Sequence, residues 1–301
     1  MSATLCLGEA LVDLIGESPV ASMRQVDRFE PHFGGATANV AVFAARAGAR
    51  IALAGAAGDD RWGHWLRDRL DTERVQRAHF PLVAGLATQL AFVAVDHHGE
   101  PTYQLYGELG QPLVDALSGR IDAAVDAAAG LFISSNTLAA AGERKLTMRA
   151  RERALEHDLP VVFDCNLRLH RWSSRADAAA SANACVPGAL LVHANRAEAE
   201  LLTGEADPER AALALRKAGA ELVVLTLGSG GAIVRGAGGL HADASAGPAR
   251  VLSTIGAGDA LTGTLLARLA LSGFYPAAAA AALDEAVAAG AAACEHWGAL
   301  D

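Results

Sequence analysis

Two hydrophobic patterns follow each other along this chain. Short apolar runs rich in Val, Ile and Leu are each followed by a segment in which apolar residues recur with helical spacing. Nearly continuous runs of this kind are typical of parallel strands that are buried on both faces. They predict core strands at 50–54, 131–134, 161–164, 190–193 and 222–227. The helical spacing predicts helices at 37–47, 61–71, 143–157 and 208–218. The alternation predicts an α/β fold with a mainly parallel sheet.

Two segments depart from this rhythm. The end of the chain predicts two long helices, 259–271 and 277–295, separated by a break at 273–276. The segments 88–96 and 100–107 flank a His-His-Gly turn and predict a β-hairpin that no helix follows. Apolar positions such as Leu90, Phe92 and Tyr103 would be exposed on an isolated ribbon. We therefore expect the hairpin to cover a site, a partner subunit, or both.

Composition favours a soluble enzyme-sized domain. The 301 residues can bury one substantial core, and the 52% hydrophobic content is rich in Ala with only 5% aromatic residues, which suits closely packed helices. Charged residues interrupt the most apolar stretches, and the first fifteen residues carry Glu9 and Asp13 without a basic leader. We therefore expect no membrane span and no signal peptide, and a cytoplasmic location.

Charge and cysteine usage narrow the classes of partner. The net charge of −9 argues against a general nucleic-acid binder or a protein that binds anionic membranes. The four cysteines have neither metal-ligand spacing nor a disulfide rhythm, so we expect buried thiols. They are Cys6, Cys165, Cys185 and Cys294.

The strongest local signal is the segment 254–260, Thr-Ile-Gly-Ala-Gly-Asp-Ala, which runs directly into an apolar helix. Its two glycines allow a tight turn, and the free N–H groups at the start of the helix favour phosphate oxygens. A carboxylate here would repel phosphate unless it accepts a proton from an attacking hydroxyl. Asp259 is therefore either a general base or an ordinary helix cap, and the motif alone gives both equal weight.

A second glycine-rich segment, 226–231, matches neither of two better-known phosphate-binding motifs. It lacks the Gly-Lys-Ser/Thr ending of a P-loop, and the strand-like run 232–235 follows Gly231 where a dinucleotide fingerprint requires a helix. This argues against an NAD-dependent oxidoreductase. Taken alone, the segment predicts a plain hairpin turn.

Two polar residues near the N-terminus are candidate ligand contacts. Asn39 lies in the first turn of a helix that follows Gly34 and Gly35, where its amide could reach a ligand or simply cap the helix or face solvent. Asp13 ends the first apolar run. At the mouth of an α/β sheet it could accept hydrogen bonds from sugar hydroxyls, although a turn-forming Asp is the plainer interpretation.

Two further polar clusters follow predicted core strands, at 164–168 and at 195–198. Ligands of open α/β sheets bind outside the carboxyl ends of the strands, so the clusters are expected to converge on one crevice. Asn195 and Glu198, three residues apart, could also form only an N-cap with a capping box.

Taken in order, these motifs resemble the ribokinase, or PfkB, family of carbohydrate kinases over nearly the whole chain. The matching segments are 8–13, 34–39, 164–168, 195–198 and 254–259. The resemblance implies a single kinase domain over residues 1–301, built as a ribokinase-like three-layer sandwich with a mainly parallel central sheet. It also implies a small β-stranded lid, from approximately 14–32 and 86–108, that would include the hairpin.

The resemblance also implies roles for individual residues. Asp259 would be the catalytic base and would face the sugar, and the N–H groups of Gly256, Ala257 and Gly258 would form an anion hole. The sugar would also contact Asp13, Gly34, Gly35, Asn39 and Arg168. Asn195 and Glu198 would organise Mg²⁺ on ATP, through water. The nucleotide would also lie against Thr226, Gly228, Gly231, Gly256 and Gly258.

Details of the resemblance concern the sugar, the ions and the assembly. The segments 8–13 and 91–96 look most like fructokinases, whereas 164–172 and 135–138 are similar to 2-keto-3-deoxygluconate kinases; ribokinase is a further alternative. Ser253 stands where the family usually carries Asp, which leaves potassium activation open. Lid-to-lid homodimers are common among similar enzymes. A catalytically silent sugar- or nucleotide-binding protein on the same fold is the alternative of a different class.

Overall fold

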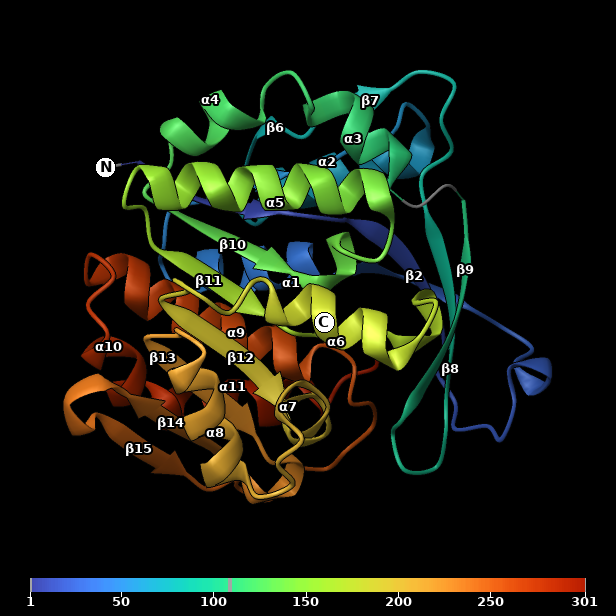
Figure 1. Ribbon diagram of the computed structural model, residues 1–301. Helices are drawn as coiled ribbons and strands as arrows, with labels where there is room; N and C mark the ends of the chain where they lie inside the picture. The colour runs from blue at the N-terminus through green and yellow to red at the C-terminus, as the bar shows by residue number, and fades with distance from the viewer. Residues whose placement is uncertain (1, 108–109, 301) are drawn as a thin grey trace.

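A large sheet forms the centre of the molecule (Figure 1). The computed structural model describes residues 2–107 and 110–300, and within them this sheet has nine strands in the order β15-β14-β13-β12-β11-β10-β1-β4-β6. The strands are β1 (Thr4–Leu7), β4 (Ile51–Ala54), β6 (Gln76–His79), β10 (Gly130–Ser134), β11 (Val161–Asp164), β12 (Leu191–Asn195), β13 (Leu222–Thr226), β14 (Ala232–Gly236) and β15 (His241–Ala244). All neighbours from β6 to β13 pair in parallel, and only β14 and β15 pair antiparallel.

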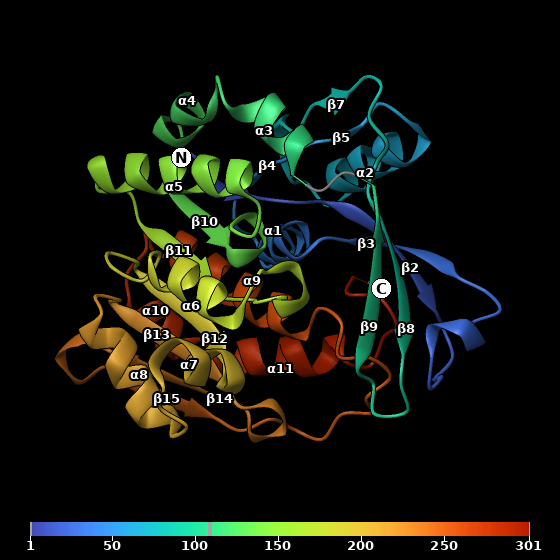
Figure 2. The same ribbon diagram turned by 45° about the vertical axis from the view of Figure 1, so that its right-hand side comes forward.

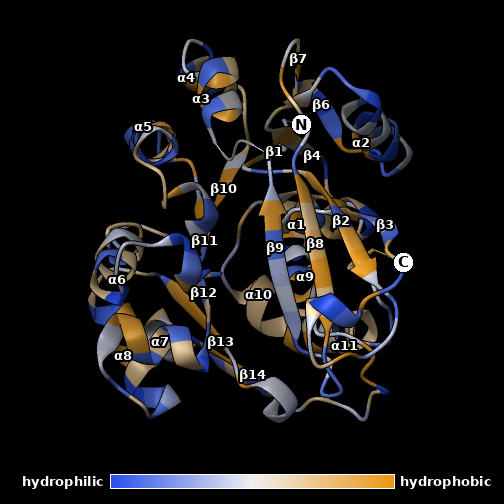
Figure 3. Ribbon diagram, turned by 90° about the vertical axis from the view of Figure 1, so that its right-hand side faces the viewer, coloured by the Kyte–Doolittle hydropathy of each residue, from blue (hydrophilic) through white to orange (hydrophobic). Residues whose placement is uncertain are grey.

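Apolar side chains on both faces of the strands explain the layered architecture. Phe132 of β10 packs into one hydrophobic core, while its neighbours Leu131 and Ile133 pack into the other. Because successive side chains of a strand point to opposite faces, continuous apolar runs require helices on both sides. The structure confirms the predicted three-layer α/β arrangement, which Figure 3 shows with the two helix layers on either side of the sheet.

The two helix layers contain different parts of the chain. The first core joins the sheet to α1 (Ala36–Arg46), α2 (Arg61–Thr72), α9 (Ala257–Leu271), α10 (Ala277–Ala281) and α11 (Leu283–Ala293). The second joins it to α3 (Gln111–Leu117), α4 (Ile121–Asp126), α5 (Ala141–Glu156), α6 (Arg175–Asn183), α7 (Arg196–Thr203) and α8 (Pro208–Lys217). In the described part of the chain, none of the helices has both the length and the apolar character needed to cross a bilayer.

The single helix predicted at 277–295 is wrong. The structure has α10 and α11, and Ala282 between them leaves the helical conformation with φ −98° and ψ 4°. Alanine has the highest helix propensity of all residues, so an alanine-rich run carries no signal for such a break. The break allows α11 to pack against the start of α9, where Gly290 lies close to the carbonyl of Ala257.

A small sheet stands beyond the end of the large sheet toward which β10, β11 and β12 point (Figure 1). Among the described residues it has four strands in the order β3-β2-β8-β9: β2 (Leu11–Gly16), β3 (Glu30–Gly34), β8 (Leu90–Val95) and β9 (Pro101–Tyr106). The pair β8 and β9 is the predicted hairpin, and β2 runs parallel to β8. The four strands lie within the predicted lid ranges, 14–32 and 86–108, except for residues 11–13 of β2 and residues 33–34 of β3. Residue 108 of the predicted range lies outside the described residues.

Asp13 is therefore not at the end of a core strand, as its position in the sequence suggested. It lies in the middle of β2, opposite His32 of β3 and Ala91 of β8. The apolar run that begins the chain is divided by Gly8 between two different sheets, β1 in the large one and β2 in the small one. A run of apolar residues does not reveal which sheet each part joins.

The tip of the hairpin is attached to the loop that precedes α9. The carbonyl of Gly99 accepts a hydrogen bond from the backbone N–H of Thr254 at 2.8 Å. The Thr254 hydroxyl lies 3.3 Å from the same carbonyl oxygen. These contacts hold the small sheet against the start of α9, although the two segments are far apart in the sequence.

The helices α1 and α9 pack against each other at very short range (Figure 2). A Cβ atom at Gly263 of α9 would lie 2.5 Å from Cβ of Phe43 and 2.8 Å from the carbonyl oxygen of Val40. Real Cβ contacts are not that short, so only glycine permits this approach.

We expect Gly263→Ala to lower the melting temperature, even though alanine favours a helix over glycine by about 1 kcal/mol. The added methyl group has to push α1 and α9 apart, and overpacking of this kind costs typically about 1–3 kcal/mol. Gly119→Ala is the matched control, because a Cβ there meets nothing within 4 Å. Thermal unfolding followed by circular dichroism measures both. A Gly263→Ala protein as stable as the control would contradict the tight packing.

Candidate active site

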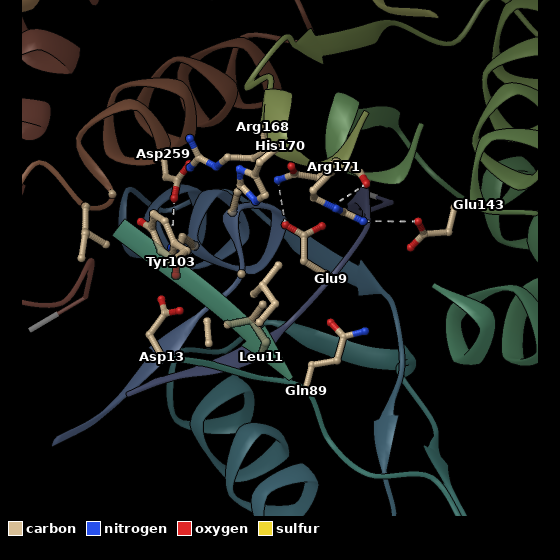
Figure 4. Close-up of a pocket in the computed structure, with 18 residues that line it drawn as sticks. Glu9, Leu11, Asp13, Gln89, Tyr103, Glu143, Arg168, His170, Arg171 and Asp259 are labelled. Atoms are coloured by element: carbon tan, nitrogen blue, oxygen red, sulfur yellow. Dashed lines mark hydrogen bonds and ion pairs between the residues drawn. The ribbon is translucent and has the colours of Figure 1, made fainter. Parts of the chain in front are cut away.

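A pocket opens between the small sheet and the large sheet, with about 740 Å³ of empty space that includes open solvent (Figure 4). Its lining comes from chain segments that are widely separated in the sequence. Six of the residues predicted from the sequence line it: Asp13, Gly35, Asn39, Arg168, Gly256 and Asp259. The fold therefore brings together at one place the motifs that we expected to face a sugar.

Asp259 lies in the first turn of α9 and points into the pocket. Gly256 is the N-cap of this helix, in a left-handed conformation with φ 77°, and no side chain caps the helix. The interpretation of Asp259 as a mere helix cap therefore does not hold. Its Oδ2 atom accepts a hydrogen bond of 2.9 Å from Nδ2 of Asn39. Asn39 is buried rather than facing solvent.

The backbone at the start of α9 offers unused N–H groups. The first helical hydrogen bond is donated by Ala260 to the carbonyl of Gly256, so the preceding N–H groups have no partner one turn earlier. The N–H of Ala257 makes only a long turn bond of 3.4 Å to Thr254. Together with the positive end of the helix dipole, this is an arrangement that binds anions.

Burial dominates the electrostatics of the pocket. It raises the pKa of Asp259 to about 7, against the hydrogen bond from Asn39 and the positive charge of Arg168. Burial also raises the pKa of Asp13 to about 7, and the nearby Asp259 adds to this effect. Two carboxyl groups that face one pocket thus change charge near neutral pH, which is the range in which a general base works best.

Asp13 has space in the pocket because its neighbour on β3 is a glycine. A Cβ atom at Gly34 would lie 2.2 Å from Oδ2 of Asp13. Gly34 therefore makes room for the carboxylate rather than lining the pocket.

Arg168 and the hairpin residue Tyr103 meet at the lining of the pocket. The guanidinium of Arg168 lies 5.7 Å from the ring centre of Tyr103 on β9, which is the distance of a cation–π contact. The hairpin therefore covers a site, as its sequence pattern led us to expect.

The residues at the opposite end of the pocket were assigned no role by the sequence analysis, although the segments 8–13, 135–138 and 164–172 were part of the family resemblance. There Glu9 accepts hydrogen bonds from Nδ2 of Asn136 at 3.1 Å and from the hydroxyl of Thr37 at 3.4 Å. Arg171 donates to the carbonyl of Asn136 at 2.9 Å and lies 3.6 Å from Oε2 of Glu143. Glu9 follows β1 closely, which was a usable signal. Glu143 gave none, because an acid in the first turn of a helix is ordinary.

A second group of predicted residues lies outside the pocket lining described above. Asn195 and Glu198 form the capping box of α7, with reciprocal hydrogen bonds of 2.9 Å each. The other oxygen of Glu198 accepts the N–H of Leu167 at 2.7 Å. The segment from Thr226 to Gly231 is the turn between antiparallel β13 and β14, as its local pattern predicted.

His193 connects this second group to the pocket, and the sequence analysis assigned it no role. Its Nδ1 lies 2.9 Å from Asp164 and 2.9 Å from the hydroxyl of Thr262, and its Nε2 lies 3.5 Å from the hydroxyl of Thr226. A Cβ at Gly258 would lie 3.8 Å from the imidazole ring. Burial lowers the pKa of His193, but the charge and hydrogen bond of Asp164 outweigh it and the net change is upward.

Among the described residues there is no group of three or more His, Cys, Asp or Glu side chains that could hold a metal ion.

Comparison with known proteins places the chain among carbohydrate kinases. The model of the pfkB family carbohydrate kinases matches residues 1–301. Fructokinase-2 of Solanum habrochaites is 30% identical over 272 residues, which cover 87% of this chain and 80% of that protein.

Solved structures agree with this match. The structure of fructokinase from Vibrio cholerae O395 in its fructose-, ADP- and calcium-bound form has a TM-score of 0.83 at 30% identity and covers 100% of this chain and 95% of that chain. Aminoimidazole riboside kinase from Salmonella enterica has a TM-score of 0.82 at 26% identity, covering 99% of this chain and 95% of that chain. The fold is therefore ribokinase-like, and the chain belongs to the PfkB family of carbohydrate kinases.

Proposed function

We propose that this enzyme transfers the terminal phosphoryl group of ATP to fructose and forms fructose 6-phosphate. The observation that carries the proposal is the buried Asp259, held by Asn39 beside the open start of α9, in a pocket that polar and charged side chains line. Similarity to fructokinases over most of the chain supports the choice of sugar. The segments 164–172 and 135–138 keep 2-keto-3-deoxygluconate as an alternative. The similarity to an aminoimidazole riboside kinase keeps ribose as another.

In the proposed reaction, Asp259 accepts the proton of the sugar hydroxyl that attacks the phosphorus atom. Asn39 orients the carboxylate, since its amide holds one oxygen and leaves the other for the substrate. A pKa of about 7 suits this task, because about half of the base is ionised at neutral pH and it is still basic enough to take a proton. The N–H groups of Gly256, Ala257 and Gly258 stabilise the charge on the transferred phosphoryl group.

The sugar is bound by groups at the same end of the pocket. Asp13 accepts hydrogen bonds from sugar hydroxyls, and Gly35 and Arg168 complete the contact surface. Gly34 contributes by keeping the space in which the Asp13 carboxylate lies.

The nucleotide lies, in this proposal, against the second group of residues. Thr226, Gly228 and Gly231 form the turn that borders it, and His193 links this turn to the anion-binding start of α9. Gly228 and Gly231 have positive φ angles, of 62° and 89°, which favour glycine. Gly228 is exposed, whereas Gly231 is buried, and a Cβ atom there would lie 1.9 Å from the carbonyl oxygen of Ala244.

Glu198 and Asn195 fit a hydrated magnesium ion. Each carboxylate oxygen of Glu198 accepts one backbone N–H, and burial together with the charge of Asp164 raises the pKa of Glu198. A fixed carboxylate next to another acid suits a cation that keeps its water shell. When bound, Mg²⁺ neutralises charge on the nucleotide phosphates.

Ser253 is buried and accepts the N–H of Ile255, so its side chain brings no negative charge for a monovalent cation. A homodimer through the small sheet and a cytoplasmic location stay predictions.

We expect fructose to give the highest kcat/KM when ADP release is measured across a panel of sugars with saturating Mg-ATP. The reason is the combined similarity to fructokinases in sequence and structure. Turnover of 2-keto-3-deoxygluconate or ribose with fructose silent would overturn the choice of sugar and leave the family membership intact.

We expect Asp259→Asn to lower kcat by roughly 100- to 10,000-fold while ATP and sugar still bind, because the change keeps the shape of the side chain and removes its proton acceptance. Steady-state assays with saturating substrates, on protein shown to be folded by its melting curve, measure this loss. Asp207→Ala is the control, since it removes the N-cap of α8, whose carboxylate accepts the N–H of Arg210. Losing that cap costs about 1 kcal/mol of stability and leaves turnover near normal. Retention of more than about a tenth of kcat in Asp259→Asn contradicts the role as base.

We expect kcat/KM for the sugar to rise with pH and to level off above about pH 7, the pKa of Asp259 in the free enzyme. A raised carboxyl pKa means that the base is protonated, and inactive, on the acid side. Asp13 titrates in the same range, so the logarithm of kcat/KM falls with a slope between about one and two below that pH. A flat profile between about pH 6 and 8, at saturating ATP, would be incompatible with this assignment.

A further inference from the structure

The end of the pocket remote from Asp259 carries a buried acid whose function the proposed reaction does not explain. We propose that Glu143 determines the substrate class: it accepts hydrogen bonds from hydroxyls of a neutral sugar and excludes sugars that carry a carboxylate at that end. The proposal rests on the proposed sugar kinase function and goes further, because it separates neutral sugars from sugar acids.

The pocket has acids at both ends. Figure 4 shows Asp259 and Asp13 toward one end, Glu143 at the other, and Glu9 and Arg171 between them. If the reacting hydroxyl lies at Asp259, the rest of the substrate extends toward Glu9 and Glu143. The groups there therefore select the substrate by its remote end.

The fold reserves a space for the Glu143 carboxylate. Glu143 lies in the first turn of α5 and is 5% exposed. A Cβ atom at Gly110, just before α3, would lie 2.2 Å from the carboxyl carbon of Glu143. Any side chain at position 110 would displace this acid, so the position of the Glu143 carboxylate requires a glycine at residue 110.

One oxygen of Glu143 has no hydrogen bond. Its Oε2 atom is buried without a hydrogen-bond donor, and its ion-pair partner, Nη2 of Arg171, is 3.6 Å away. A buried acceptor without a donor costs about 1–3 kcal/mol, and more if it is charged. Oε2 itself is closed to solvent, so a substrate hydroxyl would reach the Glu143 carboxylate from the side on which the residue lines the pocket.

The basic groups of the described pocket lining offer little to a substrate carboxylate. Arg171 donates to the carbonyl of Asn136 and faces Glu143, and Arg168 stacks on Tyr103. Burial and the two arginines lower the pKa of His170, so this side chain is neutral at pH 7 and above. A carboxylate at this end would therefore meet two negative charges, those of Glu9 and Glu143, against the one positive charge of Arg171.

The protonation of Glu143 sets the pH for a clean test. Burial raises its pKa to about 7, with Arg171 opposing and Glu9 adding to the rise. At pH 8 the side chain is mostly ionised, accepts hydroxyl hydrogen bonds and repels anions. The assays are therefore run at pH 8.

The test compares wild type with Glu143→Gln, using fructose and other neutral sugars against 2-keto-3-deoxygluconate and gluconate. In Glu143→Gln we expect KM for neutral sugars to rise about 10- to 100-fold with kcat nearly unchanged, because a hydrogen bond to a charged acceptor is lost. We expect the preference of kcat/KM for neutral sugars over sugar acids to fall at least as much. Glu152→Gln, an exposed change on the same helix, is the control and should match wild type.

A binding measurement covers the case in which Glu143→Gln fails to fold. Neutral sugars should raise the melting temperature of the wild-type protein more than sugar acids do at equal concentration. Equal shifts, or larger shifts with sugar acids, overturn the proposal.

The outcomes separate this inference from the proposed function. If wild type phosphorylates another neutral sugar but not fructose, the fructose assignment fails and the inference stands. If fructose is phosphorylated and Glu143→Gln changes neutral and acidic substrates equally or not at all, the inference fails and the fructose assignment stands. A wild-type preference for a sugar acid overturns both.

Discussion

The active pocket depends on how closely two helices approach each other. At Gly263 the backbone of α9 lies against α1 with no room for a methyl group. This approach brings Asn39 on α1 within hydrogen-bond distance of Asp259 on α9. The same packing directs the open start of α9 toward the small sheet, whose hairpin tip is bound to the preceding loop through Gly99 and Thr254. The positions of Asp259, of the Asn39 amide bonded to it and of the cover of the pocket therefore depend on one helix contact.

The buried acids of the pocket lower the free energy of unfolding. Asp13, Asp259 and Glu143 all have a pKa of about 7 in the folded protein, chiefly because burial disfavours their charged forms. Between about pH 4 and 7 the native state therefore binds more protons than the unfolded chain, and these groups make the free energy of unfolding fall as pH rises. Substrate hydroxyls that donate hydrogen bonds to the three carboxylates would reduce this loss of stability. Burial of the acids therefore both raises the pKa of Asp259 and contributes to the free energy of substrate binding.

The sequence predicted most of the fold, because continuous apolar strands and amphipathic helices follow from local patterns. It failed where the outcome depended on tertiary context. The break at Ala282 gave no signal within an alanine run, and Asp13 was assigned to the wrong sheet because one apolar run is divided between two. The six residues that meet in the pocket were found through their motifs. Glu143 was not, since its burial is created by Gly110 on another segment.

The hydrogen bond between Asn39 and Asp259 joins residues that are 220 positions apart. During synthesis at roughly 5–20 residues per second, Asn39 is therefore made about ten to forty-five seconds before its partner. Through that interval the apolar face of α1 that later packs on α9 has no helix to cover it. The nascent chain can form β1, β4 and most of the large sheet, but the base arrives only with the final tenth to fifth of the polypeptide. The pocket that holds Asp259 is therefore complete only when the synthesis of the chain is nearly finished.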